Sequence, residues 1–300
     1  MKLVSFERDG RPGLGLWESN GTIRPYRIGV DAAAGGVRAA IDAALEGIAL
    51  THSGETLASS DVRLRAPMPR PRRNIFCIGK NYREHVREFA QSGFDSSAGA
   101  GEVPDAPIVF SKVPECVAGP NDPILIDPAV SAAIDYEAEL CVIIGRGGRG
   151  IAAADALDHV WGYTIVNDVT ARDLQARNKQ WLIGKSQDSF CPMGPLAVTA
   201  DEIDLGNTSV RCWVNGELRQ DANTRDLLFD VPTLIETISA GITLHSGDLI
   251  ATGTPAGVGI GFKPPRYLKA GDKVRIEIGG IGTLENAVVD RSAAAAHAAR

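Results

Sequence analysis

The chain has 300 residues, 44% of them hydrophobic and 23% charged, which is typical of an ordinary globular protein with a sizeable core. Its net charge of −6 and the lack of a basic run interleaved with aromatic residues argue against a nucleic-acid-binding protein. The apolar runs are too short to cross a bilayer, and residues 1–9 lack the apolar core of a signal peptide, so we expect a cytoplasmic protein without membrane contact.

The beginning of the chain predicts a small N-terminal α+β domain. Three short strands separated by turns form a β-meander, at residues 2–6, 14–18 and 22–26. Apolar residues at helical spacing then predict one helix over residues 31–49. Residues 66–73 are rich in proline and arginine, a composition typical of an extended linker. The predicted divisions are therefore a small domain, a catalytic domain and a flexible tail, at residues 1–66, 67–290 and 291–300.

The larger domain opens with a strand after residue 74 and a helix over residues 83–89. This helix places His85 and Glu88 three residues apart on one face, where a carboxylate can fix the imidazole tautomer and raise its basicity, as a general base requires. The alternative is a chance pair on a charged surface helix. Residues 91–106, rich in Gly, Ser and Ala, predict either a surface loop or a lid that closes over substrate.

A strand at residues 135–145 carries two acidic side chains. Because strand side chains alternate, Glu137 and Glu139 project to one side of it. Two adjacent carboxylates near a core favour a bound cation or a shared proton, whereas a half-exposed strand would leave both in water. The strand at residues 161–168 ends in Asp168, which can supply a third ligand or cap the helical turn that follows. Such an all-oxygen set selects Mg²⁺ or Mn²⁺ first and Ca²⁺ next.

Two later segments predict further groups at this site. Lys185 is flanked by small residues and is either a surface lysine or a positive charge for a developing oxyanion. The Gly- and Thr-rich loop at residues 252–259 has backbone amides and hydroxyls that could hold a carboxylate. The remaining elements are a hairpin, a core-facing helix and two closing strands, at residues 210–220, 226–240, 273–278 and 282–289.

Five ordered blocks of the chain together resemble the fumarylacetoacetate hydrolase family. The blocks are Gly79–Tyr82 with His85 and Glu88, Asp135–Leu140, Gly162–Gln175, Gly184–Ser186 and Thr252–Gly259. The resemblance covers residues 75–289. It implies a mixed β-rich α+β fold, with a catalytic β-roll domain of the family's own type, and a homodimer as the commonest assembly. It extends to bacterial members that act in the catabolism of aromatic compounds.

The resemblance also implies roles for individual residues. By this resemblance, the ligands of Mg²⁺ or Mn²⁺ are Glu137, Glu139 and Asp168. By the same resemblance, the residues lining the substrate pocket are Arg172, Gln175, Lys185 and Thr254. The smaller acylpyruvate hydrolases of the family carry a His-x-x-Glu pair on the lid helix, and His85 with Glu88 matches that arrangement.

These residues predict an enzyme that hydrolyses a C–C bond in a 2,4-dioxo acid of the acylpyruvate or fumarylpyruvate type, giving pyruvate or a substituted pyruvate and a carboxylic acid. In this hypothesis His85, held by Glu88, deprotonates a water molecule, Lys185 or Gln175 supports the oxyanion, and the metal stabilises the leaving enolate. The alternative in the same pocket is an isomerase, tautomerase or decarboxylase that needs no activated water. A binding protein for oxo acids is a third interpretation.

Overall fold

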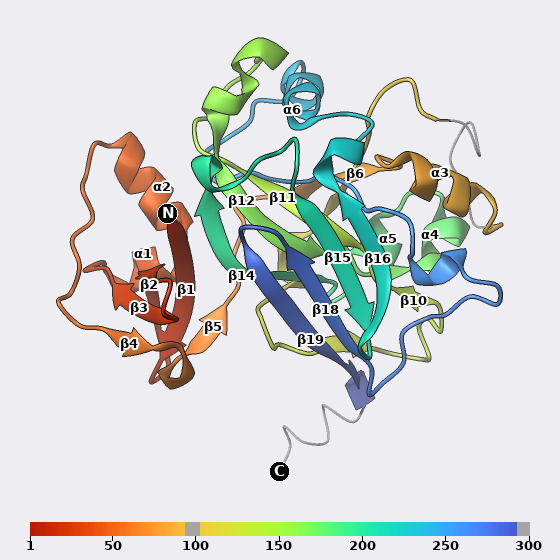
Figure 1. Cartoon of the computed structure of the whole chain (residues 1–300), viewed down its shortest axis with the longest axis horizontal. Helices are drawn as coiled ribbons and strands as arrows, with labels where there is room; N and C mark the ends of the chain where they lie inside the picture. Colours follow the sequence, from red (N-terminus) through yellow and green to blue (C-terminus); the bar gives the residue numbers. More distant parts are fainter. Residues whose placement is uncertain (94–102, 293–300) are drawn as a thin grey trace.

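A large twisted sheet dominates the computed structural model, which describes residues 1–93 and 103–292 (Figure 1). In order across the sheet, its main strands are β4 (Leu57–Ala58), β3 (Thr22–Pro25), β2 (Arg11–Trp17), β1 (Lys2–Arg8), β14 (Cys191–Thr199), β12 (Val160–Asn167), β11 (Ala138–Ile144), β17 (Leu249–Ala251), β6 (Ile75–Gly79) and β7 (Ile108–Lys112). Two further strands pair outside this path, β5 (Arg63–Arg65) with β1 and β8 (Val117–Ala118) with β14.

Two smaller sheets complete the β structure of the described residues. The five strands of the first, in order, are β16 (Glu217–Asn223), β15 (Ser209–Val214), β18 (Lys273–Ile278), β19 (Gly282–Asp290) and β9 (Ile124–Ile126). The second pairs β10 (Ile134–Asp135) with β13 (Thr170–Ala171). The predicted hairpin is confirmed between β15 and β16, where Asn215 and Gly216 both have the positive φ of a tight turn.

The helices are short and lie around the sheets. The α-helices are α1 (Val30–Ala34), α2 (Arg38–Leu45), α3 (Arg83–Ala90), α4 (Arg172–Asn178), α5 (Leu182–Lys185) and α6 (Val231–Ser239). The 3₁₀ turns are η1 (Ser59–Asp61), η2 (Pro114–Cys116), η3 (Ala153–His159), η4 (Ala200–Glu202), η5 (Thr224–Asp226) and η6 (Gly259–Gly261). The mixed β-rich α+β fold class predicted from the sequence is confirmed.

Two of the predicted helices have different bounds in the structure. The prediction of a single helix over residues 31–49 is wrong. Gly36 adopts a φ of +66° and separates α1 from α2. The helix predicted from residue 226 begins at Val231, where the side chain of Asp230 accepts a hydrogen bond from the amide of Thr233 and caps it.

The N-terminal strands continue the sheet that carries the candidate site. Strand β1 pairs with β2 on one side and with β14 on the other, so that Leu3 lies opposite Ala197 (Figure 1). Residues 67–73 contain neither helix nor strand, and Met68 is buried. The predicted domain division stays a prediction.

Among the described helices, none is long and apolar enough to cross a membrane.

Candidate active site

Three buried carboxylates meet where two central strands lie side by side. Strands β11 and β12 are antiparallel, with Ala138 opposite Asn167, so the residues just before β11 lie beside those just after β12. One oxygen from each of Glu137, Glu139 and Asp168 lies within 4.8 Å of the others. Glu137 is 4% and Glu139 1% exposed, so the half-exposed alternative is wrong.

Two cationic side chains contact these carboxylates directly. The Nζ of Lys185 lies 2.7 Å from Oε2 of Glu137 and 2.8 Å from Oδ2 of Asp168, and Nη1 of Arg172 lies 2.7 Å from Oε1 of Glu137. Burial opposes ionisation of Glu137, but Lys185 and Arg172 lower its pKa to about 2. Burial, with Asp168 and Glu137 nearby, raises the pKa of Glu139.

The structure excludes the two non-catalytic alternatives considered for Lys185 and Asp168. Lys185 ends helix α5 and is buried, so it is not a surface lysine. Asp168 does not cap the following helix, because the N-cap of α4 is Ala171. The carboxylate of Asp168 instead accepts hydrogen bonds from two lysines.

Sequence reasoning missed two charged groups that complete this network. The Nζ of Lys112, at the end of β7, lies 2.6 Å from Oδ1 of Asp168, and it also donates to the backbone oxygens of Val169 and Lys185. Burial opposes the charge of Lys112, but Asp168 raises its pKa overall. Asp135 is buried and lies 2.9 Å from Nε of Arg172. A lysine closing an apolar strand, and an aspartate two residues before Glu137, were the only signals in the sequence.

The predicted acid–base pair lies across the pocket on helix α3. Nδ1 of His85 is 3.1 Å from Oε2 of Glu88, and the imidazole is buried, so the pair is not a chance arrangement on an exposed surface. If Nδ1 donates to Glu88, Nε2 is the atom that can take up a proton from a substrate. The backbone amide of Gly257 donates to the other oxygen of Glu88 at 2.9 Å.

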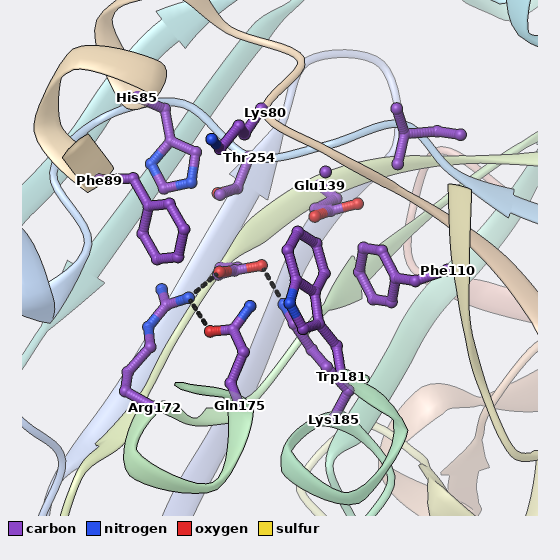
Figure 2. Close-up of a pocket in the computed structure, with 13 residues that line it drawn as sticks. Lys80, His85, Phe89, Phe110, Glu139, Arg172, Gln175, Trp181, Lys185 and Thr254 are labelled. Atoms are coloured by element: carbon purple, nitrogen blue, oxygen red, sulfur yellow. Dashed lines mark hydrogen bonds and ion pairs between the residues drawn. The ribbon is translucent and has the colours of Figure 1, made fainter. Parts of the chain in front are cut away.

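These groups surround one pocket (Figure 2). The predicted site residues that line it are His85, Glu137, Glu139, Arg172, Gln175, Lys185 and Thr254. Asp168 and Glu88 are not among the lining residues: Asp168 contacts Lys185, and Glu88 contacts His85. Additional lining side chains come from Lys80, Phe89, Phe110 and Trp181. The cavity of about 20 Å³ is large enough for a water-sized group.

The loop at residues 252–261 binds carboxylates of the protein itself. The amide of Gly253 donates to Glu139, that of Gly257 to Glu88, and those of Gly259 and Ile260 to Asp135. The hydroxyl of Thr254 donates to the backbone oxygen of Ala138 and accepts from Gln220. The sequence predicted a carboxylate-binding loop, and the structure assigns these amides to three internal carboxylates.

The donor set fits a hard divalent cation. Glu137, Glu139 and Asp168 offer oxygen atoms close together, and the structure brings no histidine or cysteine into this set within the described residues. Glu139 has no ion-pair partner in the part of the chain that the structure describes, and a buried, unpaired carboxylate is stabilised by a nearby cation. Oxygen ligands of this kind favour Mg²⁺, Mn²⁺ or Ca²⁺ over zinc or copper.

Comparisons with known proteins agree with this geometry. The family model described as "Fumarylacetoacetate (FAA) hydrolase C-terminal" matches residues 74–289. The oxaloacetate tautomerase YisK of Bacillus subtilis (strain 168) is 50% identical over 230 residues, which cover 76% of this chain and 74% of that protein.

Solved structures, among them the following two, resemble nearly the whole chain. The fumarylacetoacetate hydrolase of the psychrophilic Exiguobacterium antarcticum superposes with a TM-score of 0.82 at 42% identity, covering 97% of this chain and 100% of that one. The structure titled 2-hydroxyhepta-2,4-diene-1,7-dioate isomerase, from Mycobacterium marinum, has a TM-score of 0.76 at 34% identity, covering 97% and 99%.

Proposed function

The chain belongs to the fumarylacetoacetate hydrolase family, and we propose that it is a metal-dependent tautomerase of oxaloacetate or a closely related 2-oxo dicarboxylic acid. A relative that is half identical is described as an oxaloacetate tautomerase, and a structural neighbour is titled an isomerase. Both names favour the alternative reaction over the C–C hydrolysis that the sequence predicted first. The enzyme acts on an oxo acid in either case.

The observation that carries this proposal is the position of His85 and Glu88 opposite the carboxylate triad. Tautomerisation moves one proton from the carbon next to the 2-oxo group and one proton onto the oxygen, so it needs a general base and an acid, but no water or oxidant. Nε2 of His85 takes the proton from carbon, while Glu88 holds the ring through Nδ1. The ammonium group of Lys185, which is buried and lines the pocket, would donate the proton to oxygen.

Glu137, Glu139 and Asp168 would hold the divalent ion. Bound there, the ion would act as a Lewis acid that polarises the 2-oxo group and makes the neighbouring C–H bond more acidic. The remaining binding groups are Arg172 and Gln175. Nη2 of Arg172 is buried and has no hydrogen-bond partner among the described residues, so it is available for a carboxylate oxygen of the substrate.

The test is a Mg²⁺- or Mn²⁺-dependent ultraviolet assay of the enol and keto forms of oxaloacetate, with identification of products. Faster interconversion than in buffer, with oxaloacetate recovered intact, supports the tautomerase. Release of carbon dioxide and pyruvate would instead assign a decarboxylase. No acceleration of any of these reactions would contradict the proposal.

Acylpyruvate hydrolysis is the second candidate, because the same His85–Glu88 pair can deprotonate water. Acetylpyruvate and fumarylpyruvate in the same assay decide this point: cleavage to pyruvate and a carboxylic acid faster than oxaloacetate turnover would reverse the order of the two candidates. The homodimer and the cytoplasmic location stay predictions, and light scattering of the purified protein tests the first of them.

A further inference from the structure

We propose that Asp135 is a positioning residue, which fixes the loop at residues 257–261 and thereby holds helix α3 with its His85–Glu88 pair over the carboxylate triad. Asp135 does not line the pocket. It acts through the loop and through Arg172, both of which it contacts. The kinetic part of the test rests on the proposed function, whereas the structural part does not.

Both carboxylate oxygens of Asp135 accept two hydrogen bonds each. Its Oδ1 accepts from the amide of Gly259 at 2.6 Å and from its neighbour Tyr136 at 2.9 Å. Its Oδ2 accepts from the amide of Ile260 at 3.0 Å and from Nε of Arg172 at 2.9 Å. The side chain is fully buried, so a displaced carboxylate would leave several buried donors without a partner. The loop is therefore held at one place relative to β10.

The same loop is the surface on which helix α3 rests. Phe89 packs with Val258 and Ile260 in a small hydrophobic cluster that is separate from the main core. The amide of Gly257 donates to Glu88 at 2.9 Å. Glycine at position 261 permits close approach, since a Cβ there would lie 1.9 Å from Oε1 of Glu88. The position of Glu88, and with it that of His85, thus depends on where the loop lies.

Asp135 also reaches the triad by a second route, because Arg172 binds both Asp135 and Glu137. A substitution of Asp135 alone disturbs both routes. The variant Gly261→Ala separates them, because the three atoms nearest to an added Cβ all belong to the side chain of Glu88, and none belongs to Asp135 or Arg172. If the loop route is the important one, both variants will show the same defect.

The experiment compares wild-type protein, Asp135→Asn and Gly261→Ala by hydrogen–deuterium exchange and by steady-state kinetics. We expect faster amide exchange in residues 83–90 and 257–261 of Asp135→Asn, with strands β11 and β12 still protected. Because misplacement of a catalytic base by about 1 Å can lower a rate about 100-fold, we expect kcat to fall about 10- to 100-fold in both variants with KM little changed. Gly261→Ala keeps the test decisive if Asp135→Asn does not fold.

Asp248→Asn is the matched control. Asp248 is also a buried aspartate, which pairs with Arg73 and accepts from the amide of His245, but it lies before β17, at the end of that strand away from the site. We expect a loss of stability there without faster exchange in helix α3. Wild-type exchange in helix α3 of Asp135→Asn, or wild-type kcat in Gly261→Ala, would overturn the inference. Lack of turnover by the wild-type protein would contradict only the proposed function, since the exchange data stand without substrate.

Discussion

In the proposed reaction, His85 is the side chain on which proton transfer depends most directly. Its replacement by Ala removes the base but leaves Glu137, Glu139 and Asp168 in place, so we expect kcat to fall about 10²- to 10⁴-fold while Mn²⁺ binding is retained. Glu88→Gln should lower kcat less, because the amide oxygen can still accept from Nδ1. Steady-state kinetics and calorimetric titration with Mn²⁺ measure the two effects separately.

Glu84→Gln on the same helix is the control, because Glu84 pairs with Arg87 on the solvent side and its side chain is 69% exposed. Its kcat should stay at the wild-type value. Turnover by His85→Ala at the wild-type rate would show that another group carries the proton.

Lys112 stabilises the site from behind the triad. Both carboxylate oxygens of Asp168 accept from lysines, so Lys112→Met leaves Oδ1 buried without its partner. Breaking a buried ion pair in this way costs roughly 3–5 kcal/mol, and we expect a loss of that size in the free energy of unfolding measured with denaturant. Lys273→Met, which breaks an exposed pair with Glu285, should change it by less than about 1 kcal/mol. Equal losses in the two variants would contradict a special role for Lys112.

At the scale of strands and helices, the sequence predicted those features that depend on a local pattern of residues. The side-chain alternation predicted for residues 135–145 placed Glu137 and Glu139 together, and the end of the strand at residues 161–168 added Asp168. Lys112 and Asp168 are 56 positions apart, and their contact depends on how β7 lies against the central strands. No local period encodes that arrangement, so it could not be predicted from the sequence.

The same limit applies to the N-terminal strands and to the Gly- and Thr-rich loop. The meander was predictable from its turns, but its pairing with β14 joins residues almost 200 positions apart. The loop was recognised as a binder of carboxylates, because glycine amides can converge on an anion. Its actual partners lie on other elements of the folded chain and could not be inferred from composition.

The close contact of β12 with β14 gives a prediction about packing. A Cβ added at Gly162 would lie 1.9 Å from the backbone oxygen of Val198, so glycine is required for the strands to approach. We expect Gly162→Ala to lower the free energy of unfolding by about 1–3 kcal/mol, as overpacked sites do, in urea denaturation. Gly29→Ala, where a Cβ meets no atom within 4 Å, is the control. An unchanged urea midpoint for Gly162→Ala would contradict this account of the strand contact.

For the whole molecule, the concentration of buried charge links metal binding to stability. Asp135, Glu137, Glu139 and Asp168 are all buried, and among the described residues the side chains of Lys112, Arg172 and Lys185 form ion pairs with members of this group. A divalent ion at the triad adds positive charge where Glu139 has no ion-pair partner among the described residues. Binding to the folded chain alone raises stability by about 2.7 kcal/mol when the free ion is at about one hundred times its Kd.

We therefore expect the thermal unfolding midpoint to rise with the concentration of Mg²⁺ or Mn²⁺ and to return to its starting value after chelation. Glu139→Gln sharpens the test, because the amide oxygen can keep the hydrogen bond from Gly253 while the buried negative charge is removed. Without metal, this variant should unfold at the wild-type temperature or above it, since burying an unpaired carboxylate is unfavourable. With metal, its midpoint should rise less than that of the wild type. An equal rise in both proteins would place the stabilising ion elsewhere in the molecule.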